Sequence, residues 1–119
     1  MKIFFDGGLR PGGMEYAVVI GGHARIVRDL GPGTSMTAEW LALIAATQAA
    51  HEAGLTDALL LGDAAAVVAQ ATGKVRVPPA HLSHFMEWST LPRPTGLRLR
   101  YIKRTQNLAG IALERSRKK

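Results

Sequence analysis

The amino-acid sequence predicts an α/β fold: three antiparallel strands, then a helix, a strand, further helices, a last strand and a final helix. Two observations lead to this prediction. Short apolar runs within residues 2–29 are separated by glycine-rich turns, which is typical of strands joined as a meander. Residues 37–53, which Gly54 follows, are mostly alanine, leucine, isoleucine and tryptophan, which is typical of a buried helix. At 119 residues, the chain is expected to form one domain, residues 1–119.

The first predicted strand, residues 2–5, is a short aromatic-rich run that ends on Asp6. Glycines and a proline fill residues 7–14, which we therefore interpret as a flexible loop. Asp6 is then either a carboxylate at the end of a buried strand, where its charge needs compensation, or a solvated aspartate of a turn. Residues 15–20 and 24–29 are the next two strands, and the Gly-Gly pair between them predicts an antiparallel hairpin.

The first predicted helix can be capped by Thr34, Ser35 or Thr37, and it runs to about residue 53, where Gly54 ends it. Glu39 is the charged exception in its first turns, and the residues that share its face are apolar. This glutamate is either a first-turn residue favoured by the helix dipole or a carboxylate directed at the sheet.

The second half of the chain begins with a strand at residues 57–61, which is followed by Gly62 and Asp63. Because a helix precedes this strand, we expect it to lie parallel to its neighbour in the sheet. Asp63 is either the N-cap of the next helix or a metal ligand. The remaining predicted elements are a helix at 64–72, a linker at 73–79, a short helix at 80–89, a strand at 97–102 and a final helix at 108–117.

The net charge of +6 favours a polyanionic partner, with nucleic acid first. Many basic residues fall near the end of the chain: Arg98, Arg100, Lys103, Arg104, Arg115, Arg117, Lys118 and Lys119. The alternative is that residues 115–119 form only a solvated tail. The chain has no cysteine, no apolar run long enough to span a bilayer, and an acidic residue too early for a secretory signal. We expect a cytoplasmic location and no membrane partner.

The order of elements brings three carboxylates toward one edge of the sheet. If the fourth strand pairs parallel with the first, Asp6 and Asp63 emerge at the same edge, and a helix packed on the sheet can add Glu39. Three carboxylates in one place repel each other, and hard divalent cations are the usual remedy. Two such ions can activate a water and stabilise the leaving oxygen of a phosphodiester.

Four segments, in order and at suitable spacing, resemble the motifs of the type 1 ribonuclease H family. They are Asp6-Gly7-Gly8 with residues 10–13, residues 34–43 around Glu39, Gly62-Asp63 with residues 67–74, and residues 104–112. The resemblance covers nearly the whole chain. It implies a ribonuclease H-like fold, with a five-stranded mixed sheet in the order 3-2-1-4-5 flanked by helices.

The resemblance also implies cleavage of the RNA strand of RNA–DNA hybrids with two Mg²⁺ ions, Mn²⁺ being possible in their place. Asp6, Glu39 and Asp63 are then the catalytic metal ligands. The residues expected at the nucleic acid are Gly7, Gly8, Arg10, Thr34, Ser35, Lys74 and Asn107.

The chain differs from the family at several motif positions. Gly110 stands where the family usually has an aspartate, and Ser35 and Met36 stand where it often has two asparagines. Ala64 replaces a common serine, and no histidine lies between Lys103 and Asn107. The alternative function is therefore a catalytically weakened or inactive module that binds nucleic acid. One helical turn beyond Gly110, Glu114 is a candidate outer-shell substitute for the absent carboxylate.

Overall fold

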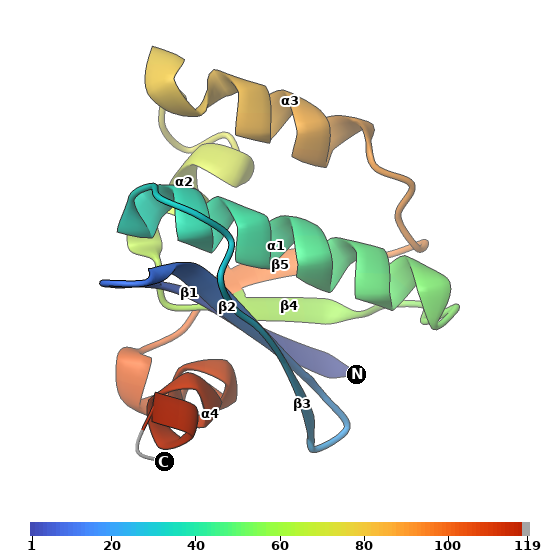
Figure 1. Ribbon diagram of the computed structural model, residues 1–119. Helices are drawn as coiled ribbons and strands as arrows, with labels where there is room; N and C mark the ends of the chain where they lie inside the picture. Colours follow the sequence, from blue (N-terminus) through green and yellow to red (C-terminus); the bar gives the residue numbers. More distant parts are fainter. Residues whose placement is uncertain (118–119) are drawn as a thin grey trace.

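The computed structural model describes residues 1–117, and it contains a five-stranded sheet with helices on both faces (Figure 1). The strands are β1 (Lys2–Arg10), β2 (Gly13–Ile20), β3 (His23–Val27), β4 (Leu59–Gly62) and β5 (Arg98–Tyr101). Their order in the sheet is β3-β2-β1-β4-β5. The first three strands pair antiparallel, and β4 is parallel to both β1 and β5. The order 3-2-1-4-5 is therefore confirmed.

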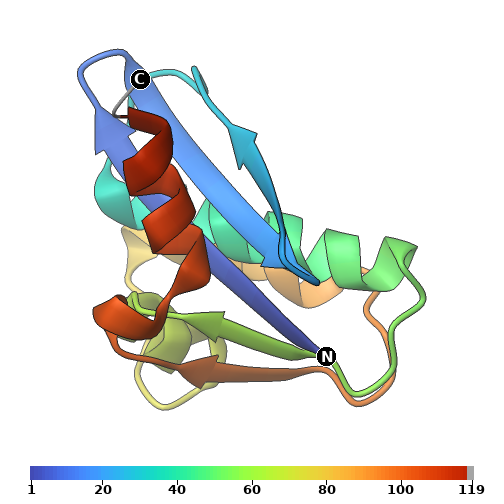
Figure 2. The same ribbon diagram turned by 90° about the horizontal axis from the view of Figure 1, so that it is seen from below.

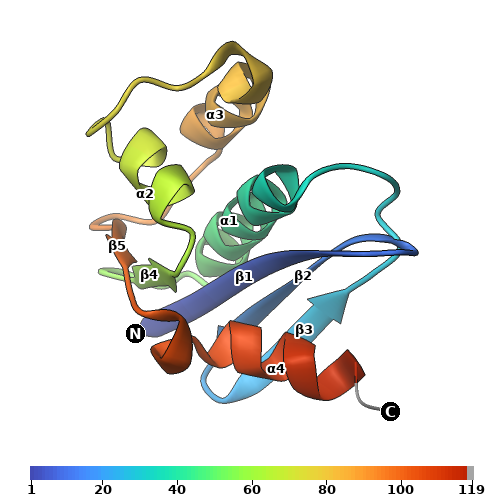
Figure 3. The same cartoon turned by 90° about the vertical axis from the view of Figure 1, so that its left-hand side faces the viewer.

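The helices divide unequally between the two faces (Figure 3). They are α1 (Ser35–Glu52), α2 (Ala65–Ala71), α3 (Leu82–Thr90) and α4 (Leu108–Arg117), with short 3₁₀ turns at Pro79–His81 and Arg104–Gln106. One face carries α1, α2 and α3, and the other carries α4, which crosses β1 and β2 (Figure 2). None of the helices in residues 1–117 combines the length and the hydrophobicity that a transmembrane span requires.

The larger hydrophobic core lies between the sheet and α1. Trp40 and Leu43 of α1 pack there with Phe5 and Leu60 of the sheet, and all four side chains are fully buried. As expected from its composition, α1 is buried over much of its surface. A smaller core under α4 joins Leu113 and Ala109 to Ala17 and Val19 of β2. The sheet is therefore fixed from both sides.

The prediction that the first strand ends at Asp6 is wrong, because β1 continues to Arg10. Gly7 and Gly8 adopt extended backbone and pair with Tyr16 and Glu15 of β2, which leaves a turn only at residues 11–12. The parallel pairing with β4, in contrast, stops at Phe4 opposite Leu61. Beyond that pair β1 and β4 are no longer bonded to each other, so an opening forms between them.

The predicted final helix at residues 108–117 is confirmed, since α4 spans Leu108–Arg117. Of the basic segment 115–119, Arg115 and Arg117 lie in the last turn of this helix, so the first part of the segment is helical rather than a solvated tail. Lys118 and Lys119 lie outside the described residues.

Candidate active site

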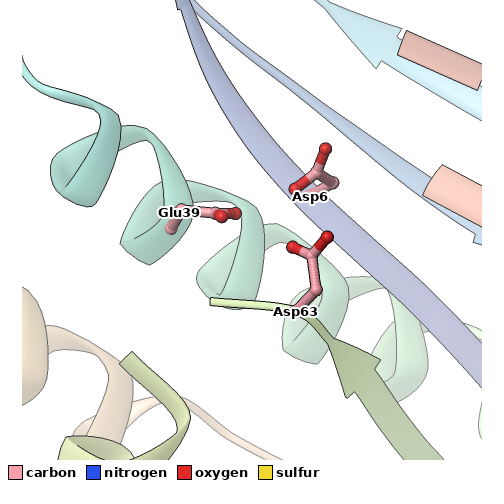
Figure 4. Close-up of side chains that lie close together, drawn as sticks. All are labelled: Asp6, Glu39 and Asp63. Atoms are coloured by element: carbon pink, nitrogen blue, oxygen red, sulfur yellow. The ribbon is translucent and has the colours of Figure 1, made fainter. Parts of the chain in front are cut away.

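Three carboxylates from three separate elements meet in the opening between β1 and β4 (Figure 4). Asp6 comes from the middle of β1, Glu39 from the second turn of α1, and Asp63 directly follows β4. Each offers an oxygen, and the three oxygens all lie within 4.8 Å of one another. Among residues 1–117, this is the only group of three or more carboxylate, His or Cys side chains with such spacing.

The parallel register of β1 and β4 brings the two aspartates together. Phe4 and Leu61 form the last pair of this register, and Asp6 and Asp63 each stand two residues beyond it. Equal spacing along parallel strands leaves equivalent positions side by side. Although β1 itself continues to Arg10, its pairing with β4 ends just before Asp6. Asp6 and Asp63 therefore lie together where this pairing ends, as the sequence predicted.

Glu39 reaches the aspartates because α1 lies unusually close to β1. A Cβ atom on Gly7 would overlap the backbone of Ala38, so only glycine permits this approach. The Gly7 N–H donates a hydrogen bond of 2.5 Å to Oε1 of Glu39. The glycine after Asp6 therefore both admits the helix and orients its carboxylate.

Asp63 does not cap the following helix. The N-cap position of α2 is Ala64, and no side chain accepts a capping hydrogen bond there. Of the two roles that the sequence allowed for Asp63, the structure removes the capping role. Its carboxylate is left to face Asp6 and Glu39 (Figure 4).

Burial and mutual repulsion make this cluster hold protons when no cation is bound. Burial raises the pKa of Glu39 to about 9, and the charges of Asp6 and Asp63 add to the increase, while the Gly7 N–H bond opposes it. Burial and the neighbouring Asp63 raise the pKa of Asp6 to about 7, although the hydrogen bond with Glu39 and the charge of Arg104 oppose the increase. A hard divalent cation that displaces these protons would find oxygen donors of the kind that it prefers.

The carboxylates lie in a cleft of about 780 Å³. Of the residues expected at a nucleic acid, Gly7, Gly8 and Ser35 line this cleft. Sequence reasoning did not select Tyr101, Arg104, Thr105 or Arg117, which also line it. The first three could have been found, because Tyr101 ends β5 and Arg104 and Thr105 follow it, and β5 is parallel to β4 and ends at the same edge of the sheet.

Three other residues expected at the nucleic acid lie outside the cleft lining. Thr34 caps α1, with its hydroxyl oxygen accepting a 3.0 Å hydrogen bond from the Thr37 N–H. Arg10 is exposed at the end of β1, beside a separate shallow pocket. Lys74 is exposed in the segment after α2. Their surfaces are accessible, and their contacts with nucleic acid stay predictions.

Asn107 requires a correction. Its side chain is fully buried: the amide nitrogen donates to the Phe5 carbonyl at 3.0 Å, and the amide oxygen accepts from the Ala109 N–H at 3.1 Å. Both polar groups are used within the protein, so a direct contact with nucleic acid is not available in this structure. Asn107 instead joins the start of α4 to β1, close to Asp6.

Gly110 faces Asp6 from the first turn of α4. A Cβ atom on Gly110 would lie 3.1 Å from Oδ2 of Asp6, so the position directly adjoins the cluster. Glu114 also lines the cleft, but it is exposed and stands outside the group whose oxygens lie within 4.8 Å. Glu114 therefore lies in the same cleft as Asp6, Glu39 and Asp63 but is not a member of this carboxylate group.

Residues 16–114 match the model of a family described as reverse transcriptase-like; the match includes Glu39 and Asp63 and begins after Asp6. RNase H1 of the archaeon Halobacterium salinarum is 30% identical, with a TM-score of 0.70 over 96% of this chain and 97% of that one. The N-terminal RNase H domain of Mycobacterium tuberculosis Rv2228c is 25% identical, with a TM-score of 0.72 over 98% and 95%.

LC11-RNase H1, solved in complex with an RNA/DNA hybrid, is 22% identical, with a TM-score of 0.73 over 90% of this chain and 88% of that one. A search of curated protein sequences found no match. The sheet order, the family match over most of the chain and the 30% identical relative all indicate the same family. The chain therefore belongs to the ribonuclease H family, within the group described as reverse transcriptase-like.

Proposed function

We propose that this protein is a metal-dependent endonuclease that hydrolyses the RNA strand of RNA–DNA hybrids. The observation that carries the proposal is the group formed by Asp6, Glu39 and Asp63, with oxygens within 4.8 Å of one another in an open cleft. The likeness to RNase H1 of Halobacterium salinarum supports the choice of reaction.

Asp6, Glu39 and Asp63 would hold two Mg²⁺ ions, or Mn²⁺ in their place, as carboxylate ligands. When bound, these cations supply Lewis-acid activation of a water molecule and stabilisation of the leaving oxygen of the phosphodiester.

The protein's own groups prepare this site in two ways. The N–H of Gly7 holds Oε1 of Glu39 in place, so the carboxylate needs little rearrangement to act as a ligand. The raised pKa values of Glu39 and Asp6 mean that binding a cation must release protons. Affinity for the metal should consequently increase with pH through the neutral range.

The test is cleavage of a hybrid whose RNA strand carries an end label, in the presence of magnesium, by the natural protein and by Asp6→Asn. We expect RNA fragments from the natural protein only, and an uncut DNA strand. Duplex DNA serves as the control for hybrid selectivity, because a hybrid differs from it in its 2′-hydroxyls and groove shape. Equal products from the two proteins would overturn the proposal.

Gly110 favours a second candidate, a nucleic-acid-binding module in which catalysis is weak or lost. The position adjoins Asp6 and brings no carboxylate, so the site has fewer ligands than the family usually supplies. This candidate predicts hybrid binding that weakens steeply with salt and shows no magnesium-dependent turnover.

Gly110→Asp should tighten magnesium binding and increase turnover at limiting metal. The new side chain starts 3.1 Å from Oδ2 of Asp6, a separation that a small rotation of Asp6 relieves. Glu114→Gln should lower turnover modestly, by about 2-fold, in the natural chain and hardly at all in the Gly110→Asp background. The measurement is a magnesium titration of the cleavage rate for all four members of this cycle.

An unchanged titration for Gly110→Asp would mean that this corner of the site does not affect metal binding. If Glu114→Gln is silent in both backgrounds, Glu114 is only a surface residue of α4.

A further inference from the structure

A buried glutamate lies beside the cleft and has no part in the proposed chemistry. Glu15 of β2 is only 1% exposed, and it pairs with two arginines. Its Oε2 accepts from Nε of Arg117 at 2.7 Å and lies 2.5 Å from Nη2 of the same side chain. Its Oε1 lies 3.6 Å from Nε of Arg28. A buried carboxylate requires positively charged partners. This requirement does not explain why one of the two partners, Arg117, lies in the cleft.

Arg117 is the last residue of α4, and its side chain lines the same cleft as Asp6, Glu39 and Asp63. The guanidinium lies over Gly8, where a Cβ atom would come within 2.5 Å of Nη2. Glycine at this position therefore leaves room for the arginine head. Gly8 is two residues beyond Asp6 on β1, which corresponds to about 7 Å along a strand.

Glu15 binds only one edge of the guanidinium. It contacts Nε and Nη2, and Nη1 has no hydrogen-bond partner among residues 1–117. The side chain is 36% exposed and lines the cleft, so it is accessible to a ligand there. An arginine held in one orientation presents its fork to a phosphate with little further loss of side-chain entropy.

We propose that Arg117 binds a phosphodiester of the nucleic acid, and that Glu15 holds the guanidinium in position for it. The inference rests on the proposed function, because it identifies a second contact of the same substrate. We assign to Arg117 a phosphate other than the one that is cleaved, because the guanidinium lies over Gly8, about 7 Å along β1 from Asp6.

The test measures binding of a fluorescent RNA–DNA hybrid by anisotropy at several salt concentrations, with EDTA present to prevent turnover. Arg117→Gln should lower the affinity about 10-fold at low salt and reduce the slope of log K against log salt by about 1. In cleavage assays with magnesium, the same variant should increase KM while changing kcat less than about 2-fold.

Two matched controls distinguish the loss of this contact from the loss of one positive charge and from the loss of an ion pair with Glu15. Arg115→Gln removes the same charge from the same exposed end of α4, outside the cleft lining. Arg28→Gln removes the other partner of Glu15, also outside the cleft lining. Both should keep the salt slope of the natural protein. Arg117→Lys, which keeps the charge without the fork, should keep the slope and recover part of the affinity.

The role of Glu15 is tested by the cycle of Glu15→Gln and Arg117→Gln. If Glu15 positions the arginine, Arg117→Gln should cost less affinity in the Glu15→Gln background than in the natural chain. Melting temperatures of all variants show whether each remains folded.

The proposal is overturned if Arg117→Gln lowers the melting temperature but binds hybrid with the affinity and slope of Arg115→Gln. Arg117 would then only stabilise the packing of α4. If the natural protein cleaves hybrid and Arg117→Gln behaves as Arg115→Gln, the proposed function stands and only this inference fails. If the natural protein binds hybrid without cleaving it, the proposed endonuclease fails while the salt slope still decides the role of Arg117.

Discussion

Asp63→Asn should lower RNA-strand cleavage by at least about 100-fold, which corresponds to about 2.7 kcal/mol of transition-state stabilisation. Asparagine has the shape of aspartate but lacks the negative charge that the cluster contributes toward a divalent cation. The side chain caps no helix, since Ala64 occupies the N-cap position of α2 without a side-chain hydrogen bond. The melting temperature without metal should therefore stay within about 2 °C of the natural protein, or increase slightly as repulsion of Asp6 is relieved.

The measurement pairs single-turnover cleavage in magnesium with thermal unfolding in EDTA. Asp57→Asn is the matched control, because Asp57 precedes β4 with a φ of 55°, a conformation that asparagine tolerates well. It should leave both cleavage and melting temperature unchanged. A large loss of stability in Asp63→Asn, with cleavage reduced only in proportion, would show that Asp63 has a structural role instead.

Glu39→Gln should stabilise the metal-free protein at alkaline pH, with an increase in melting temperature of about 5 °C near pH 8.5. The pKa of Glu39 is raised from its usual 4.5 to about 9 by burial and by the two aspartates. Between these values the folded chain holds a proton that the unfolded chain has released. Stability of the natural protein therefore falls as pH rises from about 5 to 9.

Glutamine resembles the protonated glutamate and can still accept the Gly7 N–H bond, so it avoids this loss. At pH 5 the two proteins should melt at similar temperatures, and the difference should increase with pH. Part of the pH dependence should remain in the variant, because the pKa of Asp6 is also raised. Thermal unfolding in EDTA from pH 5 to 9 measures both effects.

Added magnesium should stabilise the natural protein and have no such effect on Glu39→Gln, since a ligand is lost. Glu52→Gln, in the last turn of the same helix and exposed, is the control and should behave as the natural protein in both experiments. A lower melting temperature for Glu39→Gln than for the natural protein, in EDTA at pH 8.5, would show that the charge of Glu39 does not destabilise the metal-free protein.

The convergence of Asp6 and Asp63 could be predicted because it depends on the order of elements, whereas the reach of Glu39 also depends on the close approach of α1 to Gly7. A strand, a helix and a second strand in succession require parallel pairing, and that pairing fixes which ends meet. The length of β1 could not be predicted in the same way. Glycines after an aspartate are equally typical of a turn, and only the pairing of Gly7 and Gly8 with β2 extends the strand.

The roles of Asn107 and Arg117 illustrate a different obstacle. Asn107 was expected at the nucleic acid from its place in a motif, but its partner Phe5 is 102 residues away in the chain. Arg117 and Glu15 are also 102 residues apart. A single sequence gives no sign of such pairs, since neither periodicity nor local composition depends on them.

The position of β1 also has a consequence for how the molecule folds. The strand comes first in the chain but lies at the centre of the sheet, and its partner β4 follows about fifty residues after it ends. The local hairpins of β1, β2 and β3 can form early, whereas the pairing of β1 with β4 must close a long loop and is intrinsically slow. Because Asp6 and Asp63 meet only through that pairing, the capacity to bind cations should arise late in folding, after most of the antiparallel sheet has formed.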